Sequence, residues 1–223
     1  IHIDQWNNDI ENIHPCGKKL HFPYDFDDKK SKILIIAGDI SDDIDLSIEY
    51  LNKISDKYAK ILFVDGNHEH VKRYPNLFTS DEINKKVTND KIVYIPNNPY
   101  IKDKTVFIGC CGWWDYKSGL EDDYFKEWIK SFKKKENLSF CNNVLNRSIE
   151  EYNYIKDLVE KYDNDKNIDN IVILTHTVPL EMLVLDEHNT VVNTKFKDII
   201  DNSKKISHWI FGHTHDHIET KYK

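Results

Sequence analysis

The sequence has little arginine and alanine, and it contains no long hydrophobic run. Arginine occurs only at Arg73 and Arg147, while lysine, isoleucine and asparagine are abundant. We interpret this bias as the codon usage of an AT-rich genome, so the lysines are not taken as phosphate-binding residues. The longest apolar runs, 33–37 and 171–174, are strand-sized. A membrane-spanning helix needs roughly 18 apolar residues, so we expect no membrane partner.

An excess of basic residues is also absent. The net charge is −7, from 31 basic and 38 acidic residues. Nonspecific binding to nucleic acid requires many lysine or arginine contacts to phosphates. Nucleic acid is therefore a disfavoured partner, although the composition still allows a local basic patch.

Cysteine is scarce and does not form a recognisable framework. The four cysteines are Cys16, Cys110, Cys111 and Cys141, without a CxxC motif. The adjacent pair, Cys110 and Cys111, is poorly suited to a single structural disulfide. A reduced intracellular compartment is favoured, and we expect a cytoplasmic protein.

The pattern of apolar segments predicts an α/β fold. A chain of 223 residues suits a single domain, here residues 1–223. Apolar spacing predicts helices at 43–58, 142–162 and 195–200, and the charged stretch 121–141 reads as an inserted helix and loop. Helices that alternate with strands lie outside the sheets. Strands are predicted at 33–37, 61–64, 92–95, 105–110, 171–174, 209–211 and 218–222.

Polar residues of the metal-binding type follow four of the predicted strands. The segments are GDISD at 38–42, DGNHE at 65–69, TH at 175–176 and GHTH at 212–215. Since the carboxyl ends of strands carry the sites of α/β folds, we expect these four segments to meet. His213 and His215 are two residues apart, so an extended chain would project both to one side. His2 and Asp4 have the same spacing.

This mixture of imidazoles, carboxylates and an amide indicates transition metals. Mn, Fe, Zn or Co suit such ligands, whereas calcium prefers oxygen alone. There are more candidate ligands than one ion needs, so we expect two divalent ions, most simply Mn, with Asp39 able to bridge them. Two metals about 3.5–4 Å apart can clamp a phosphate and hold a hydroxide nucleophile.

The ordered set of these motifs resembles the calcineurin-like metallophosphoesterase superfamily. The resemblance extends from His2 to the end of the chain, and the segment 107–116 is similar to small bacterial and phage members. It implies a four-layer sandwich, with two mixed β-sheets flanked by helices. It also implies hydrolysis of phosphomonoester or phosphodiester bonds by a metal-bound hydroxide. The substrate class stays open, and loops 97–103, 113–123 and 179–194 are expected to set it.

The resemblance also assigns roles to individual residues. Asp39 matches the bridging carboxylate. His68 matches the histidine that protonates the leaving oxygen, and Asp42 matches the carboxylate that orients His68. The remaining matches are metal ligands: Asn67, His176 and His213 for one ion, and His2 and His215 for the other.

The first metal motif departs from the family pattern. The family begins with DxH, and the aspartate two residues before His2 falls outside this sequence. We therefore expect the domain to be truncated at its N-terminus, just before or within this motif.

Other interpretations accompany several of these residues. Asp42 could cap the following helix, either instead of orienting His68 or in addition to it. Glu69 and His70 are expected to lie behind the ligands or in solvent. Trp113, Trp114 and Tyr116 could line a substrate pocket, but at least one tryptophan is expected in the core. Two alternative functions stay open as well. One is a nuclease of the same superfamily, and the other is a non-catalytic scaffold on this fold.

Overall fold

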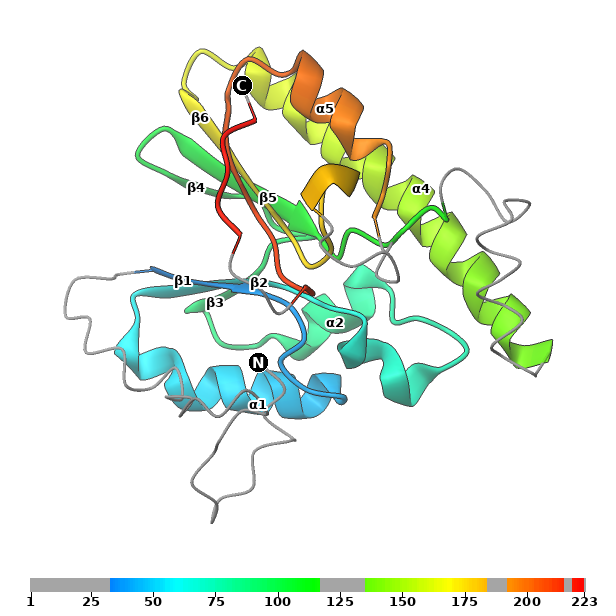
Figure 1. The fold of residues 1–223 in the computed structure, drawn as a ribbon. Helices are drawn as coiled ribbons and strands as arrows, with labels where there is room; N and C mark the ends of the chain where they lie inside the picture. The colour runs from blue at the N-terminus through cyan, green and yellow to red at the C-terminus, as the bar shows by residue number, and fades with distance from the viewer. Residues whose placement is uncertain (1–32, 117–134, 184–191, 215–217, 223) are drawn as a thin grey trace.

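The computed structural model describes residues 33–116, 135–183, 192–214 and 218–222, and these residues form two sheets (Figure 1). The first sheet has three strands in the order β1-β2-β3, all parallel. Its strands are β1 (Ile33–Ala37), β2 (Lys60–Val64) and β3 (Ile92–Tyr94).

The second sheet has four strands in the order β4-β5-β6-β7. Only β4 runs antiparallel to its neighbour, so this sheet is mixed while the described strands of the first sheet are all parallel. The two sheets of the expected sandwich are therefore both present among the described residues. The strands are β4 (Tyr100–Lys102), β5 (Thr105–Cys110), β6 (Asn170–Thr175) and β7 (Ile206–Ile210).

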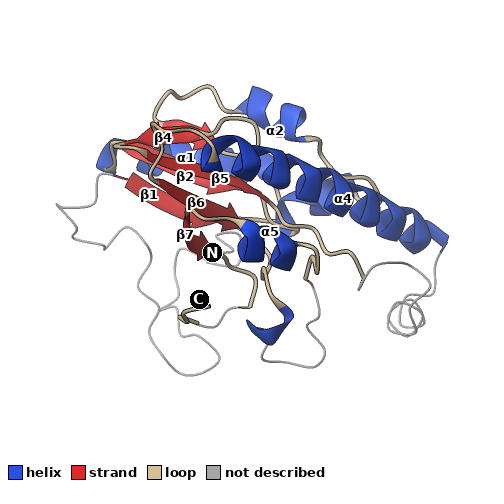
Figure 2. Cartoon of the chain, turned by 90° about the horizontal axis from the view of Figure 1, so that it is seen from above, coloured by secondary structure: helices blue, strands red, loops and turns tan. Residues whose placement is uncertain are grey.

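Helices cover the outer faces of both sheets and give the predicted four layers (Figures 1 and 2). Helix α1 (Ile44–Ile54) packs on the first sheet, and α4 (Lys135–Asp163) and α5 (Phe196–Asn202) pack on the second. A third set of apolar side chains, including Leu62, Val64 and Leu174, fills the space between the sheets. The shorter elements are η3 (Ser55–Lys57), η4 (His68–Arg73), α2 (Ser80–Lys86) and η5 (Glu181–Leu183).

The first helix shows how the sequence sets element boundaries. Ile44, Ile48 and Leu51 are buried at helical spacing. The N-cap is Asp43, whose side chain accepts the backbone N–H of Asp45 at 3.0 Å. The interpretation of Asp42 as the cap of this helix is therefore wrong.

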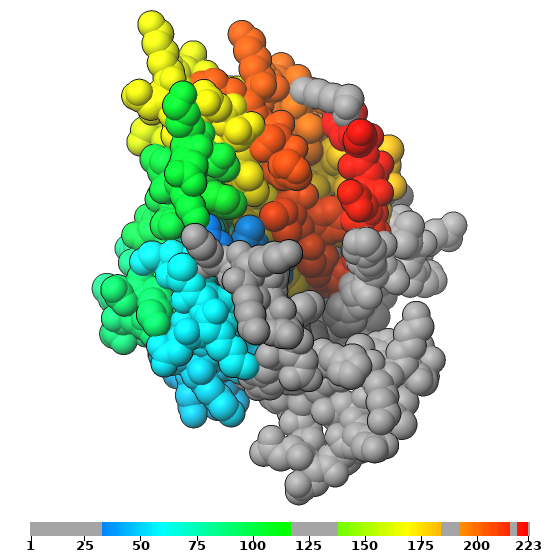
Figure 3. Space-filling view, turned by 90° about the vertical axis from the view of Figure 1, so that its left-hand side faces the viewer, coloured from blue at the N-terminus to red at the C-terminus, as the bar shows by residue number. Residues whose placement is uncertain are grey.

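Some predicted elements differ from those in the structure. Residues 218–222 were expected to form a strand but have no strand structure, and they lie on the surface beside α5 (Figure 3). Ile218 and Tyr222 instead pack against Ile200 and Phe211. Strand β4 and helix α2 were not predicted, because each is too short to show a clear periodicity. Among the described residues, no helix combines the length and apolar character needed to cross a membrane.

Candidate metal centre

Four side chains that were predicted as ligands lie together where strands from both sheets end. Asp39 follows β1, Asn67 follows β2, His176 follows β6 and His213 lies three residues beyond β7. The Nε2 atom of His176 is 3.1 Å from Asp39 Oδ2, 3.0 Å from Asn67 Oδ1 and 3.1 Å from His213 Nδ1. The ligand atoms of Asp39, His176 and His213 all lie within 4.8 Å of one another. The chain thus gathers four donor atoms from distant segments.

The orientation of His176 indicates what this cluster can hold. Its Nδ1 lies 2.7 Å from the carbonyl oxygen of Ala37 and donates to it. A neutral ring therefore presents the Nε2 lone pair to two oxygens and a second imidazole nitrogen. One proton on Nε2 can satisfy only part of this arrangement, whereas one divalent cation can accept electron pairs from all four atoms. Oxygen and imidazole ligands in this ratio fit a borderline transition metal.

The charges in the cluster are strongly coupled. Burial would raise the pKa of Asp39, but the hydrogen bond and charge of His176 and the backbone N–H of His68 hold it well below its usual range. Burial would lower the pKa of His176, and the bond and charge of Asp39 reverse this and raise it. Asp39 is therefore an anion at neutral pH, and an anionic carboxylate is the form that can bind a metal cation.

The loops after β1 and β2 are held together by the buried carboxylate of Glu69. Its Oε2 accepts the backbone N–H groups of Asp39 at 3.0 Å and Gly66 at 2.7 Å. Its Oε1 accepts those of Ile40 and Ser41 at 2.6 and 3.2 Å, together with the Ser47 hydroxyl at 3.0 Å. Burial and the charge of Asp39 raise the pKa of Glu69. Glu69 lies behind the ligands, as expected, and each loop depends on it.

Two glycines allow these loops to approach each other closely. Gly38 and Asp39 both have positive φ, 76° and 51°. A Cβ on Gly66 would lie 2.2 Å from Asp39 Oδ1, and one on Gly38 would lie 2.7 Å from the backbone nitrogen of Gly66. Only glycine fits at either position without moving the carboxylate or the backbone.

His68 and Asp42 form a pair at the edge of the cluster. The Nδ1 of His68 is 2.5 Å from Asp42 Oδ1, and its Nε2 is 4.0 Å from Asp39 Oδ2. The side chain of His68 is 33% exposed and that of Asp42 is 44% exposed, against 1% for His176. The ring therefore has one nitrogen held by a carboxylate and the other near the cluster, and solvent can reach it.

The aromatic residues after β5 are mostly structural. Trp113 is buried between His70 and Phe140, which confirms that at least one tryptophan belongs to the core. Trp114 lies beside the His213 ring, at 6.5 Å between centroids. The loop is anchored by buried Glu151 on α4, whose Oε2 accepts the N–H groups of Gly112 and Trp113 at 2.8 and 2.9 Å.

Other predicted residues lie outside the described part of the chain. His2 and Asp4 precede residue 33, and His215 falls within 215–217. The ligands predicted for a second ion therefore stay predictions, and so does the role of Asp39 as a bridge between two ions. The roles of Glu69 and Glu151 as acceptors for backbone N–H groups were not predicted in detail. For Glu69, the only signal in the sequence is its position directly after the Asn-His pair. For Glu151, the sequence gives no signal.

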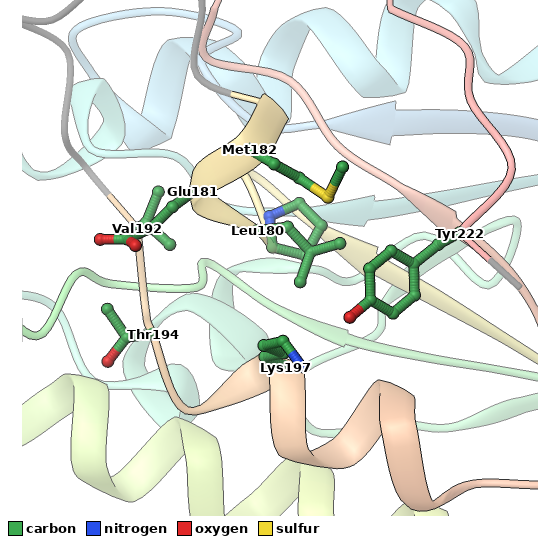
Figure 4. Close-up of a pocket in the computed structure, with 8 residues that line it drawn as sticks. Leu180, Glu181, Met182, Val192, Thr194, Lys197 and Tyr222 are labelled. Carbon is green, nitrogen blue, oxygen red and sulfur yellow. The ribbon is translucent and has the colours of Figure 1, made fainter.

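A separate hollow of about 220 Å³ lies between η5, α5 and the C-terminal segment (Figure 4). Leu180, Met182 and Tyr222 give it apolar walls, with Lys197 at its side. Part of the predicted specificity loop 179–194 lines it, but none of the predicted ligands does.

Comparison with known proteins agrees with this geometry. A sequence model described as calcineurin-like phosphoesterase matches residues 4–217, nearly the whole chain. The chain belongs to the calcineurin-like phosphoesterase family. Calcineurin-like phosphoesterases are hydrolases that typically bind divalent metals. The predicted family and its α/β architecture are therefore confirmed.

One relative of this calcineurin-like phosphoesterase is an uncharacterized protein of Acanthamoeba polyphaga mimivirus. It is 28% identical over 205 residues, which cover 82% of this chain and 71% of the relative. No solved structure gives a significant match.

Proposed function

We propose that this protein is a metal-dependent phosphoesterase that hydrolyses phosphomonoester or phosphodiester bonds. The observation that carries the proposal is the convergence of three acceptor atoms on the Nε2 of His176, beside a histidine–aspartate pair. Asp39, Asn67, His176 and His213 would hold one ion. His2 and His215 are proposed for a second, which Asp39 would bridge.

The bound ions would supply charge neutralisation of the phosphate and a water of lowered pKa. The protein's own residues provide the rest of the chemistry. Asp42 accepts the Nδ1 proton of His68 and so fixes the orientation of the ring. The Nε2 proton of His68 then protonates the departing oxygen as the ester bond breaks. The partial exposure of His68 leaves room for a substrate and for reprotonation from solvent.

Removal of metal tests the proposal directly. The protein is stripped with a chelator and assayed on aryl phosphate mono- and diesters, and Mn, Zn, Fe, Co or Mg is then added back. Activity should vanish on stripping and return with Mn or another transition ion. Full activity in a metal-free sample would contradict the proposal.

His68→Ala tests the role of the proton donor. This variant should keep its metal and lose roughly 10² to 10⁴ in kcat, with the larger loss on an alkyl ester, because a good leaving group departs without a proton. The matched control is His208→Ala, which removes an exposed histidine of β7. Loss of metal together with activity, or equal losses on both esters, would refute the assignment.

The same panel separates the alternative functions. A scaffold would bind metal and hydrolyse none of the esters. A nuclease would cleave oligonucleotides faster than small diesters, and its binding would weaken steeply with salt.

A further inference from the structure

We propose that Asp65 and His70 are a positioning pair that fixes the turn carrying Asn67 and His68. The pair joins the two ends of the segment 65–70, which contains a proposed metal ligand and the proposed proton donor. This inference rests on the proposed function, and its test includes a measurement that needs no catalytic activity.

The contact spans the turn from one end to the other. His70 Nε2 lies 2.8 Å from Asp65 Oδ2, and the backbone N–H of His70 donates to the carbonyl of Asn67 at 3.2 Å. The His70 and Asp65 side chains are only 2% and 6% exposed. Water cannot compete for this bond, so it is stronger than an equivalent bond at the surface.

The direction of the bond is set by neighbouring groups. The backbone N–H of Phe78 donates to His70 Nδ1 at 2.9 Å, which places the ring proton on Nε2, facing Asp65. The Tyr94 hydroxyl donates to the other oxygen of Asp65 at 2.6 Å. The His70 ring also packs against Trp113, 5.2 Å between centroids. The His70 ring is therefore held from the loop before α2 and from the loop after β5, while Tyr94 on β3 bonds only the oxygen of Asp65 that does not face His70.

A shift of this turn would act on the chemistry itself. The backbone N–H of His68 donates to Asp39 Oδ1 at 3.0 Å, and the side chain of Asn67 points at His176. Glu69 anchors the start of the turn through the N–H of Gly66, and His70 anchors its end. Displacement of a reacting group by about 1 Å can cost 10²-fold in rate. The loss of His70 should therefore misplace both Asn67 and His68.

Two substitutions separate the two hydrogen bonds of the His70 ring, one to Asp65 and one from Phe78. In His70→Gln the side-chain amide reaches the Nε2 position and still donates to Asp65. In His70→Asn the shorter amide keeps an acceptor for Phe78 but no longer reaches Asp65. The matched control is Tyr94→Phe, which removes a hydrogen bond to the same carboxylate from outside the turn.

The first readout is the Co(II) absorption spectrum and affinity of the metal-loaded protein. His70→Asn should change the spectrum and weaken binding by about 10-fold, a usual loss when a group that orients a ligand is removed. His70→Gln and Tyr94→Phe should retain the wild-type spectrum. The second readout is kcat on alkyl and aryl esters, where only His70→Asn should lower the alkyl-to-aryl ratio.

The outcomes distinguish positioning from simple stability. If His70→Asn lowers Tm as much as Tyr94→Phe does, but leaves the spectrum and the ratio unchanged, the proposal is overturned. If His70→Asn does not fold, the experiment uses Asp65→Asn. The asparagine keeps one acceptor oxygen, so the changes in the Co(II) spectrum, the metal affinity and the alkyl-to-aryl ratio should have the same direction but be smaller. If the wild-type protein hydrolyses none of the esters, the proposed function fails and the Co(II) spectrum alone decides the proposal.

Discussion

The two sheets hold their parts of the candidate site by different means. The loops after β1 and β2 are tied together by one side chain, Glu69, which accepts four backbone N–H groups. The segments after β6 and β7 are tied by backbone bonds. The N–H of His176 donates to Cys111 at 2.9 Å, and the N–H of Gly212 donates to His176 at 2.9 Å.

This difference separates a vulnerable half of the site from a tolerant one. A substitution at Glu69 removes the acceptor of both loops at once and leaves their N–H groups buried without partners. No single side-chain substitution removes the backbone bonds that hold His176. Single side-chain substitutions should therefore displace the half of the site that carries Asp39 and Asn67 more readily than the half that carries His176.

The largest expected effect comes from Glu69→Gln. Its amide group would face N–H groups that need an acceptor, so both loops should shift. We expect metal affinity to fall by about 10- to 100-fold, with activity falling in parallel. Titration with Mn or Zn, followed by calorimetry, measures the loss.

The control for this experiment is Glu181→Gln, an exposed glutamate beside the hollow lined by η5. It should bind metal like the wild type. Unchanged metal affinity in Glu69→Gln would show that the loops are held by something other than the carboxylate.

A pair of glycine substitutions sharpens the comparison. Gly66→Ala places a Cβ 2.2 Å from Asp39 Oδ1, whereas the nearest atom to a Cβ on Gly212 is the carbonyl oxygen of Ala37 at 2.9 Å. Gly66→Ala should therefore displace the Asp39 carboxylate and weaken metal binding. Gly212→Ala should also force the backbone at Ala37 to move, but it should weaken binding less, because an approach of 2.9 Å is a smaller overlap than one of 2.2 Å. Equal losses in both variants would contradict the distinction between the two halves.

Much of this arrangement could be predicted from the sequence because the signals are local. Strands β1 and β5 were located to the residue, since apolar runs ending in polar or glycine residues mark buried strands. The candidate residues Asp39, Asn67 and His176 were selected because each lies within three residues of the end of such a strand.

The supporting contacts could not be predicted in this way. Glu151 lies 38 residues from Trp113 along the chain, and no periodicity links the two. The partners of Glu69 and His70 likewise depend on how two loops pack, which requires the tertiary structure. The position of β4 depends on its pairing with β5, not on a pattern of its own.

An intermediate effect, on the pH dependence of stability, is expected from Glu151, the buried carboxylate that anchors the loop after β5. Burial and the charge of Asp65 raise the pKa of Glu151 from 4.5 to about 8. Between these values the folded protein keeps a proton that the unfolded chain has released, so stability falls as pH rises, by up to about 1.4 kcal/mol per pH unit. Both N–H groups bond to the same oxygen of Glu151.

Glu151→Gln removes this titration. Urea unfolding at pH 5, 6, 7 and 8 should show the variant gaining stability relative to wild type as pH rises through this range. A constant difference across the range would mean that Glu151 titrates near its ordinary value in the folded protein.

The smallest effect is expected from Thr177→Val. The Thr177 hydroxyl donates to the carbonyl of Gly112, in the half held mainly by the backbone. Its loss should lower the free energy of unfolding by about 1 kcal/mol and leave metal affinity unchanged, because His176 keeps its backbone bonds. A fall in metal affinity would show that side chains support this half as well.

Two of the proposed ligands have backbone conformations that are unfavourable for residues with a Cβ. Asp39 and His213 have φ values of 51° and 69°, a region that costs a residue with a Cβ about 1–2 kcal/mol. Glycine at either position would relax the chain while removing the ligand. Random mutation combined with selection for thermal stability alone should therefore erode these two residues early.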